Sequence, residues 1–371
     1  MSWAHTGYAQ RIHFGAGVVD AIAGVCDELR LRRVLVVTTA GRRSSPDGER
    51  LLQTLGARAA AVFDGVRSHV PTSAVDAAVA MAGATRPDGV VSFGGGSCAD
   101  LGKAVCWWAE QAVASDEVAT YADRPTLPHV AVPTTYSGAE LTPFFGMTDE
   151  MTRRKSGGGG PTIAPAAALY DPVVTLTTPP RVSAETGMNA LAHGVECAYS
   201  PTRTPEAEAV ALACIERVAG ALPVVVARPG DLDARTTMLE GAVLGGRCLQ
   251  NASMGVHHGL SQMMGARTGL PHGLVNALVL PHAMRFNAGA AGAAATRIGA
   301  ALGDPADPAG ALDGLRASLG LPAMLAECGV TMEDVEAVAR HSGENRNVAA
   351  NVRPVTVDDA RAILAAALGG P

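Results

Sequence analysis

Asn189 and His193 are two side chains whose types and spacing could do chemistry. They lie four residues apart in the proline-free run 182–199. This run predicts a helix that carries both side chains on one face. An imidazole can move a proton near neutral pH or bind a metal, whereas an amide can only hydrogen-bond. The pair therefore indicates one wall of a reactive pocket.

A second polar set begins at the doublet His257–His258. His258 and Gln262 again have the four-residue spacing of one helix face, and His272 follows in the next loop, directly after a proline. A lone histidine on an apolar helix is more often a buried structural group than a catalyst. Several at these spacings favour a shared site, and we expect one pocket to be lined by Asn189, His193, His258 and His272.

The glycines Gly94, Gly95 and Gly96 follow an apolar run that predicts a strand, and Ser97 begins a predicted helix. Glycines let the backbone approach an anion, and free N–H groups at a helix start attract it. Ser97 and Asp100 also have capping-box spacing. The loop therefore predicts a phosphate cradle, with an ordinary strand-to-helix turn as the alternative, because it is not the GxGxxG fingerprint.

The pattern of apolar runs predicts two domains. Strands alternating with helices indicate a parallel sheet covered on both faces, and beyond Pro180 the pattern is helical throughout. A glycine run after Ser156 indicates a flexible joint, which gives an α/β domain over 1–158 and an all-helical domain over 159–371. The predicted strands are 33–39, 58–63, 89–93 and 127–132, and the predicted helices are 47–57, 73–85, 182–199, 205–222, 231–263, 273–301, 308–328, 331–341 and 356–368.

Composition narrows the class of protein. The 371 residues are 48% hydrophobic and carry a net charge of −6, which provides no basic footprint for nucleic acid. Seven cysteines without a CxxC pair indicate reduced thiols in a cytoplasmic protein. We find no signal peptide and no apolar run of about 18 residues, so we expect no membrane partner. Only two lysines occur, Lys103 and Lys155, which suggests that each has a specific role.

These motifs together resemble the iron-containing alcohol dehydrogenase superfamily. The matching stretches are the 94–97 loop with Asp100 and Lys103, the run 133–135, and Pro271–His272, and the order holds from the turn at 14–17 to the C-terminal helices. Within that superfamily the chain is most similar to the maleylacetate reductases. That similarity rests on residues 134–143, 189–193, 257–258 and 351–355.

The resemblance implies a Rossmann-like dinucleotide-binding domain, an all-helical domain as in dehydroquinate synthase, and an active site in the cleft between them. It implies NADH or NADPH as cofactor. Thr39 stands where some relatives carry an acidic residue that grips the ribose hydroxyls, so the choice between the two stays open, and Arg42–Arg43 could meet a 2′-phosphate. The implied cofactor-binding residues are Gly94, Gly95, Gly96, Ser97, Asp100, Thr39, Thr134, Thr135, Leu141, Thr142, Lys155 and Gln262.

The resemblance also raises the question of a metal. Metal-dependent relatives bind iron or zinc through one Asp and three His, which correspond here to Asn189, His193, His258 and His272. A neutral amide is a poor ligand for a divalent cation, although zinc sites of three histidines exist. We expect no metal. Gln262 replaces a histidine of many relatives and cannot titrate, so we expect the proton to come from His258, His193, His272, Tyr136 or water.

The expected reaction is hydride transfer from the nicotinamide to a small conjugated or carbonyl-bearing acid, such as maleylacetate to 3-oxoadipate. It would serve aromatic catabolism or a biosynthetic pathway, in a cytoplasmic homodimer. Arg353 is the candidate cation for a dianionic substrate, and His257 is a second candidate contact. Alternatives are a metal-dependent alcohol or aldehyde dehydrogenase, a dehydroquinate synthase-like lyase and a non-catalytic binder. The scarcity of lysine argues against the lyase, and the intact Ser97, Asp100 and histidine set argues against the binder.

Overall fold

The computed structural model describes residues 7–113, 120, 123–152 and 155–369. The chain forms two compact units, an α/β unit of residues 7–135 and 139–178, and a helical unit of residues 136–138 and 179–369. The boundary expected after residue 158 differs from this division. The segment up to Thr178 stays with the α/β unit because it contributes a strand to its sheet.

The α/β unit is built on a six-stranded sheet in which every pairing is parallel, in the order β1-β8-β5-β4-β2-β3. The central pairs are in register, with Val91 opposite both Val36 and Val130. Four strands match the predicted ones, while β1 and β8 were not predicted, since each is only four residues long. The strands are β1 (Arg11–Phe14), β2 (Val34–Thr38), β3 (Ala59–Phe63), β4 (Gly89–Gly94), β5 (His129–Pro133) and β8 (Ala167–Tyr170).

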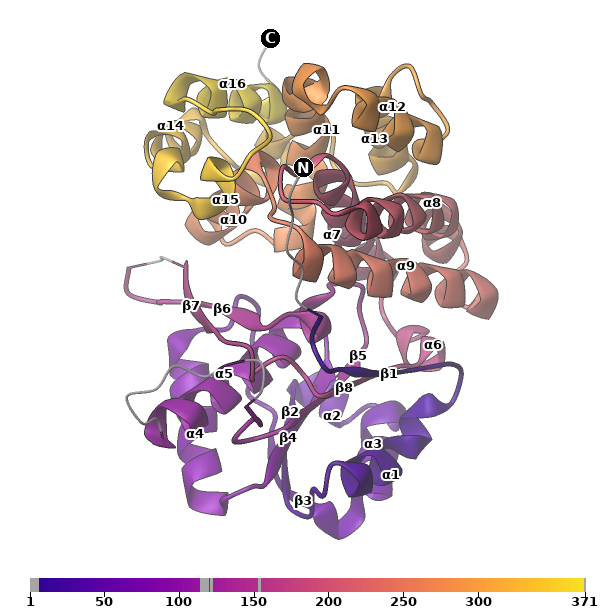
Figure 1. Ribbon diagram of the computed structural model, residues 1–371, viewed down its shortest axis with the longest axis vertical. Helices are drawn as coiled ribbons and strands as arrows, with labels where there is room; N and C mark the ends of the chain where they lie inside the picture. Colours follow the sequence, from indigo (N-terminus) through magenta and orange to yellow (C-terminus); the bar gives the residue numbers. More distant parts are fainter. Residues whose placement is uncertain (1–6, 114–119, 121–122, 153–154, 370–371) are drawn as a thin grey trace. The chain divides into compact units, whose positions relative to one another are not determined.

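Alternate residues of the buried strands face opposite sides of this sheet, as the two-residue period requires. Leu35 and Val37 belong to the apolar cluster that contains α4 and α5, and Val34 and Val36 belong to the cluster that contains α1 and α3. Figure 1 shows these helix pairs on the two sides of the sheet. The helices of this unit are α1 (Ile22–Glu28), α2 (Ala40–Arg43), α3 (Pro46–Leu55), α4 (Thr72–Thr85), α5 (Gly96–Val113) and α6 (Pro172–Thr175), with short 3-10 turns at Val18–Ala21, Gly56–Arg58 and Ala139–Leu141.

The glycine run after Ser156 is not the flexible joint that the sequence suggested. It lies in β7 (Lys155–Gly159), which pairs antiparallel with β6 (Phe144–Thr148). A Cβ atom on Gly157 would lie 2.1 Å from the carbonyl oxygen of Phe145, so only glycine permits this approach of the two strands. The glycines therefore allow close strand pairing rather than a hinge.

The described residues of the helical unit contain helices and turns but no strand, as predicted. Two predicted helices are each divided in two, and a third, 308–328, ends at Ser318 and is followed only by a 3-10 turn at Leu325–Cys328. The run 231–263 breaks between Asn251 and Val256, and the run 273–301 breaks at Gly292, whose φ of 54° ends one helix and starts the next. The helices are α7 (Pro180–Tyr199), α8 (Pro205–Ala227), α9 (Leu232–Asn251), α10 (Val256–Thr268), α11 (His272–Ala291), α12 (Ala293–Leu302), α13 (Pro308–Ser318), α14 (Met332–Arg340), α15 (Arg346–Ala349) and α16 (Val357–Leu368), with 3-10 turns at Leu325–Cys328 and Ser342–Glu344.

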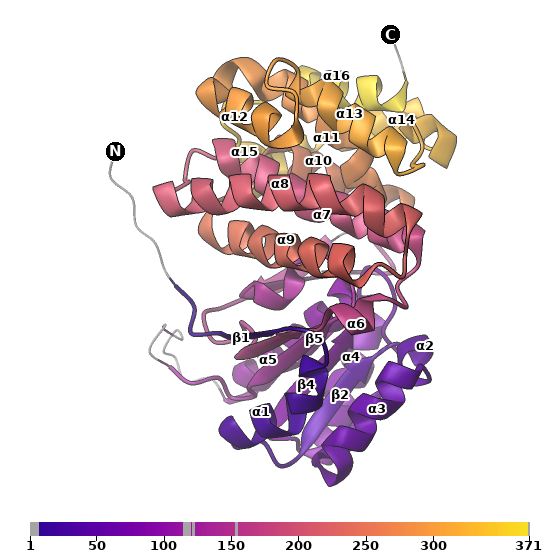
Figure 2. The ribbon, with the colours of Figure 1, turned by 90° about the vertical axis from the view of Figure 1, so that its right-hand side faces the viewer.

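Helix α8 lies side by side with α7 and α9 (Figure 2). Its Leu222 and Ile215 face Gly187 and Gly194 of α7, so the two helix backbones pack closely. Among the described helices, α8 alone is long and apolar enough to cross a membrane, judged by length and composition only. The sequence analysis did not predict this. Core helices of soluble bundles have the same property. The packing of α8 against α7 and α9 is that of a bundle helix.

Candidate active site

Three of the buried polar side chains of helix α7 lie on one face of that helix. Asn189, His193 and Glu196 are spaced by four and three residues, so they share one face. Asn189 is 6% exposed, His193 3% and Glu196 0%. Buried polar groups need hydrogen-bond partners, so the contacts of these three side chains show which of their atoms remain for a ligand.

The amide of Asn189 is engaged at both ends. Its Nδ2 atom donates to the carbonyl oxygen of Ser137 at 3.3 Å, and its Oδ1 atom accepts from Nδ2 of Asn276 on α11. Asn276 is fully buried and follows His272 by one helical turn. The amide therefore links α7 to α11 and to the 136–138 segment of the same unit.

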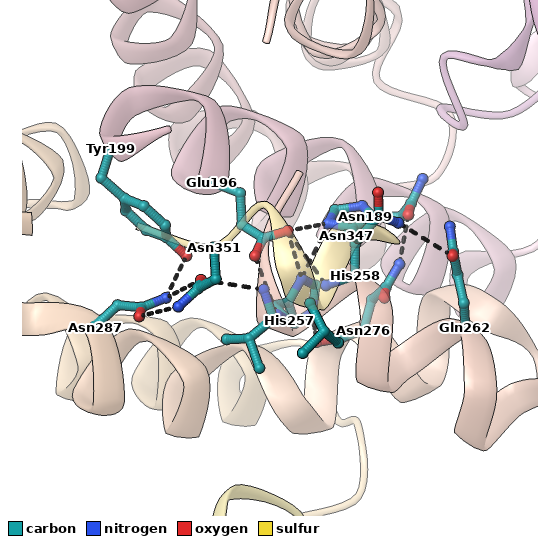
Figure 3. A network of polar contacts seen from close by, with 12 residues as sticks. Asn189, Glu196, Tyr199, His257, His258, Gln262, Asn276, Asn287, Asn347 and Asn351 are labelled. Atoms are coloured by element: carbon teal, nitrogen blue, oxygen red, sulfur yellow. Dashed lines mark hydrogen bonds and ion pairs between the residues drawn. The ribbon is translucent and has the colours of Figure 1, made fainter. Parts of the chain in front are cut away.

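The carboxylate of Glu196 caps the start of α10 (Figure 3). Its oxygens accept from the backbone N–H groups of His257 at 3.1 Å and His258 at 3.2 Å, and from Nδ1 of His258 at 2.5 Å. A negative charge at a helix N-terminus is stabilised by the free N–H groups there. Burial alone would raise the pKa of the Glu196 carboxyl, but the hydrogen bonds from His257 and His258 hold it well below its usual value.

A glycine and an asparagine complete the start of α10. The Oδ1 atom of Asn351 accepts from the N–H of Val256 at 3.1 Å. A Cβ atom on Gly255 would lie 2.6 Å from that Oδ1 and 2.8 Å from Oε1 of Glu196, so only glycine leaves room for both. Asn351 in turn exchanges two hydrogen bonds of 2.9 Å with Asn287 of α11.

Three histidine rings meet near the start of α10. The rings of His193 and His258 are stacked with centroids 4.8 Å apart, and the ring of His272 lies 6.2 Å from that of His258. Among the described residues, Nδ1 of His193 and Nε2 of His258 are buried without a hydrogen-bond partner. Burial lowers the pKa of both imidazoles, although Glu196 opposes the shift at His258. Two unpartnered ring nitrogens are thus available to a ligand.

The two residues predicted to contact the substrate have other partners. His257 is fully buried, with Nε2 3.0 Å from the carbonyl oxygen of Asn276 and Nδ1 3.2 Å from Nδ1 of His258, so both ring nitrogens are already used and a substrate contact is not supported. The guanidinium of Arg353 stacks on Phe286 at 4.2 Å and donates to its carbonyl oxygen.

Tyr136 was a candidate proton donor and Gln262 a candidate cofactor contact, and both have hydrogen-bond partners within the protein. The hydroxyl of Tyr136 is buried and accepts from the guanidinium of Arg235 at 2.9 Å. Gln262 lies on α10 one turn after His258, and its Oε1 accepts from Asn347 at 3.2 Å. Tyr136 is therefore a buried structural hydroxyl in this structure, whereas Gln262 shares a helix face with His258, as predicted.

In the α/β unit, the glycine loop lies against the segment that follows β5. The N–H of Thr134 donates to the carbonyl oxygen of Gly94 at 2.9 Å, and a Cβ atom on Gly95 would lie 3.2 Å from the side chain of Thr135. Gly94 has φ of 149°, and its Cβ atom would meet Cys98. Both threonine hydroxyls are buried without a partner among the described residues, which suits a loop that binds a ligand.

Asp100 and Lys103 form an ion pair of 2.8 Å on α5. The helix starts at Gly96, so the expected capping box at Ser97 is absent, and Asp100 instead accepts from the N–H of Gly146 at 3.4 Å. The Lys103 ammonium is fully buried and donates to Thr142 and to the carbonyl oxygens of Ala139 and Phe144. Lys103 therefore fixes the segment that holds the buried Leu141 and Thr142.

The remaining predicted cofactor residues lie at the ends of β2 and β7. Thr39 caps α2 by accepting from the N–H of Arg42 at 3.2 Å. The guanidinium of Arg42 donates to Thr177 and Thr178, so it already has partners. Lys155 is the first residue of β7 and is exposed. Thr39, as expected, offers no carboxylate to a ribose.

The sequence reading missed two residues of this site. Glu196 follows His193 by three residues, which puts it on the same helix face, and this spacing could have identified it. Asn276 follows His272 by four residues on α11. Its contact with Asn189 joins two helices that are distant in sequence. The residues next to Asn276 in the sequence do not predict that contact.

Comparison with known proteins places the chain in a family. Residues 9–172 match the iron-containing alcohol dehydrogenase model, and residues 183–368 match the model of the C-terminal part of the Fe-containing alcohol dehydrogenase family. The chain therefore belongs to the iron-containing alcohol dehydrogenase family and is an oxidoreductase.

Several proteins similar to this chain are maleylacetate reductases. Maleylacetate reductase 2 of Cupriavidus pinatubonensis is 40% identical over 83% of this chain and 80% of its own length. The crystal structure of maleylacetate reductase from a Rhizobium species has a TM-score of 0.87 at 34% identity, covering 100% of this chain and 99% of that one. The sulfoacetaldehyde reductase of Bifidobacterium kashiwanohense, solved in complex with NAD⁺, has a TM-score of 0.88 at 25% identity and covers 100% of both chains.

The donor set of this chain does not fit the iron that the family name implies. The resemblance puts Asn189 at the position of the carboxylate ligand, and the oxygen of this amide already accepts from Asn276. The remaining donors would be imidazoles, and among the described residues no carboxylate takes the place of the anionic ligand beside them. Glu196 does not replace it, because its carboxylate lies at Nδ1 of His258, on the side of the ring opposite to the unpartnered Nε2.

Proposed function

We propose that this protein is a reductase that transfers hydride from NADH or NADPH to a small conjugated or carbonyl-bearing organic acid, with maleylacetate as the first candidate, and that it needs no metal. The observation that carries the proposal is the buried Nε2 atom of His258, which has no partner among the described residues and lies beside His193. The maleylacetate reductases among its relatives support the substrate class.

The nicotinamide, when bound, supplies the hydride. We place its phosphates at the loop of Gly94, Gly95, Gly96 and Ser97, where Thr134 and Thr135 provide unpartnered hydroxyls. Cradle glycines and a helix start suit a pyrophosphate because backbone N–H groups can face it without a side chain in the way.

The substrate chemistry requires a hydrogen-bond donor and a proton. Hydride adds to one carbon of a carbon–carbon double bond conjugated to a ketone, and the electron pair of that bond moves to the ketone oxygen as an enolate. Nε2 of His258, once it has taken a proton from water, and the ring of His193 stabilise the enolate oxygen by hydrogen bonding, and the proton on Nε2 or one from water then goes to the neighbouring carbon. This balances two electrons and one proton without a Lewis acid.

The proposal extends to the cellular setting that the resemblance implies, a cytoplasmic homodimer serving the breakdown of aromatic compounds. Its competitor is an alcohol or aldehyde dehydrogenase, because the three histidines of the metal-dependent relatives are all present. The two reactions differ in the bond that is reduced.

Labelled cofactor separates them. The protein is incubated with NADH or NADPH in which both hydrogens at C4 of the nicotinamide are deuterium, together with maleylacetate or with a panel of aldehydes. We expect one deuterium on carbon in 3-oxoadipate and no incorporation with the aldehydes. Deuterium found only in alcohols would refute the proposal.

A further inference from the structure

We propose that Glu196 is a positioning residue, which together with His257 holds the ring of His258 protonated on Nδ1, so that Nε2 is the atom offered to the substrate. The kinetic consequence rests on the proposed function. The state of the ring itself does not, and it can be measured in the protein without substrate.

The hydrogen position follows from a chain of donors and acceptors. A carbonyl oxygen can only accept, so Nε2 of His257, 3.0 Å from the carbonyl oxygen of Asn276, carries a hydrogen. Nδ1 of His257 lies 3.2 Å from Nδ1 of His258. The carboxylate of Glu196 is the nearer neighbour of that same His258 atom, at 2.5 Å. A carboxylate oxygen only accepts, so Nδ1 of His258 must carry the hydrogen.

Glu196 is itself fixed, which makes it an effective support for the ring. Its carboxylate also accepts from the backbone N–H groups of His257 and His258 in the first turn of α10. Figure 3 shows these contacts between the carboxylate on α7 and the first turn of α10. One carboxylate therefore sets both the start of the helix and the orientation of the ring that the helix carries.

A metal bound by Glu196, His257 and His258 is the obvious alternative. Their ligand atoms all lie within 4.8 Å of one another. Two ligands of one tetrahedral zinc, at bonds of about 2.0 Å, lie about 3.3 Å apart. The 2.5 Å between Nδ1 of His258 and Oε2 of Glu196 is shorter than this and is a hydrogen-bond distance. The cluster is thus a closed hydrogen-bond network.

The consequence for the reaction is that one atom faces the substrate in either protonation state. With Nδ1 protonated, Nε2 either accepts a hydrogen bond or, after gaining a proton, donates one. A ring with the opposite tautomer would turn its lone pair toward Glu196, where two acceptors would then face each other. An oriented imidazole with a carboxylate behind it is a known way to fix the reactive tautomer.

The first measurement is made on the parent protein. Histidine labelled with ¹⁵N is incorporated, and the ring signals of His258 are assigned by their loss in His258→Gln. We expect a protonated-type shift for Nδ1 and a bare-type shift for Nε2. A bare Nδ1 would overturn the proposal, whatever the turnover of the enzyme.

The second measurement is on Glu196→Gln, which keeps the size of the side chain but provides only one acceptor atom. We expect the Nε2-protonated form of His258 to appear and kcat to fall ~10–100-fold, the usual effect of losing such a support, while KM stays within a few-fold. A folded variant with the parent kcat and the parent ring signals would overturn the proposal.

Two controls separate positioning from general damage. Asn351→Ala removes the other acceptor at the start of α10 and should lower the melting temperature while leaving the His258 signals unchanged. Glu240→Gln removes a carboxylate from a surface ion pair with Arg217 and should leave both unchanged. If Asn351→Ala shifts the His258 signals as Glu196→Gln does, helix capping alone explains the effect and Glu196 has no separate positioning role. If the parent has the predicted tautomer but no turnover with any nicotinamide and acid, the proposed function fails and the positioning stands.

Discussion

Asn189 donates its amide hydrogen to the carbonyl oxygen of Ser137 across 3.3 Å, a contact that a carboxylate at the same position could not make. The other end of the amide accepts from Asn276. The Ser137 carbonyl requires a donor and so an amide, whereas the Asn276 donor would suit an amide or a carboxylate. An amide at position 189, rather than the carboxylate of the metal-binding relatives, therefore suits the hydrogen bonds around it.

Asn189→Asp should therefore destabilise the metal-free protein. The new carboxylate would lose the donor and place an oxygen against the Ser137 carbonyl, which costs about 1–3 kcal/mol for a buried unsatisfied group. The same change supplies the missing anionic ligand, so zinc or iron should raise the melting temperature of the variant but not that of the parent. Stoichiometric metal in the purified parent, found by elemental analysis, would contradict this account.

His258→Ala should reduce turnover by ~10²-fold or more, because it removes the group that we assign to hydrogen bonding and proton transfer. Cofactor affinity should stay within a few-fold. His258→Gln keeps a hydrogen-bonding side chain without a titratable group, so it separates proton transfer from orientation. His341→Ala is the matched control, since that ring is exposed and pairs with Glu344. Parent turnover in a folded His258→Ala protein would rule out the assignment.

Gly255→Ala should disturb the start of α10. The added Cβ atom meets Asn351 and Glu196 at 2.6 and 2.8 Å, so at least one of the two caps must shift. We expect a lower melting temperature and changed ring signals for His258. Gly220→Ala is the control, because that glycine lies inside α8 with nothing within 4 Å of its Cβ position, and alanine there should stabilise by about 0.5–1 kcal/mol. Equal melting temperatures of the two variants would show that the hydrogen bonds of Asn351 and Glu196 to α10 do not require a glycine at position 255.

Gly95→Val tests the phosphate cradle. Its Cβ atom would already lie 3.2 Å from Thr135, so the larger side chain must displace the loop that we propose for the pyrophosphate. NADH and NADPH titrations, followed by fluorescence, should show at least ~10-fold weaker binding, as expected for about 1.4 kcal/mol of lost contact. Gly83→Val, on an exposed part of α4 with open space around it, should bind as the parent does. Unchanged titration of Gly95→Val would mean that the cradle is elsewhere.

The sequence predicted those strands and helix faces that depend on short-range residue patterns. Alternating apolar runs and glycine punctuation located β2 to β5, and the four-residue spacings placed Asn189 with His193 and His258 with Gln262 on shared helix faces. Helix ends were harder to predict. The breaks before Val256 and at Gly292 lie within runs of helical composition, where backbone geometry rather than propensity decides.

What the sequence could not predict depends on contacts between distant segments. Three examples are Gly157, Asn276 and Arg235, whose roles depend on the backbone or side chain that each contacts. The sequence alone does not predict those contacts. The substrate roles expected for His257 and Arg353 rested on their motifs alone, and the structure places His257 within a hydrogen-bond network and Arg353 on Phe286.

The central claim is that the protein reduces an organic acid with a nicotinamide and without a metal. The most direct test follows the loss of reduced-nicotinamide absorbance when chelator-treated, metal-free protein is mixed with NADH or NADPH and maleylacetate. We predict turnover with at least one of the two cofactors, at the same rate before and after chelation and with no increase on adding iron or zinc. Absence of turnover with both cofactors, or activity that vanishes on chelation and returns with metal, would contradict the account.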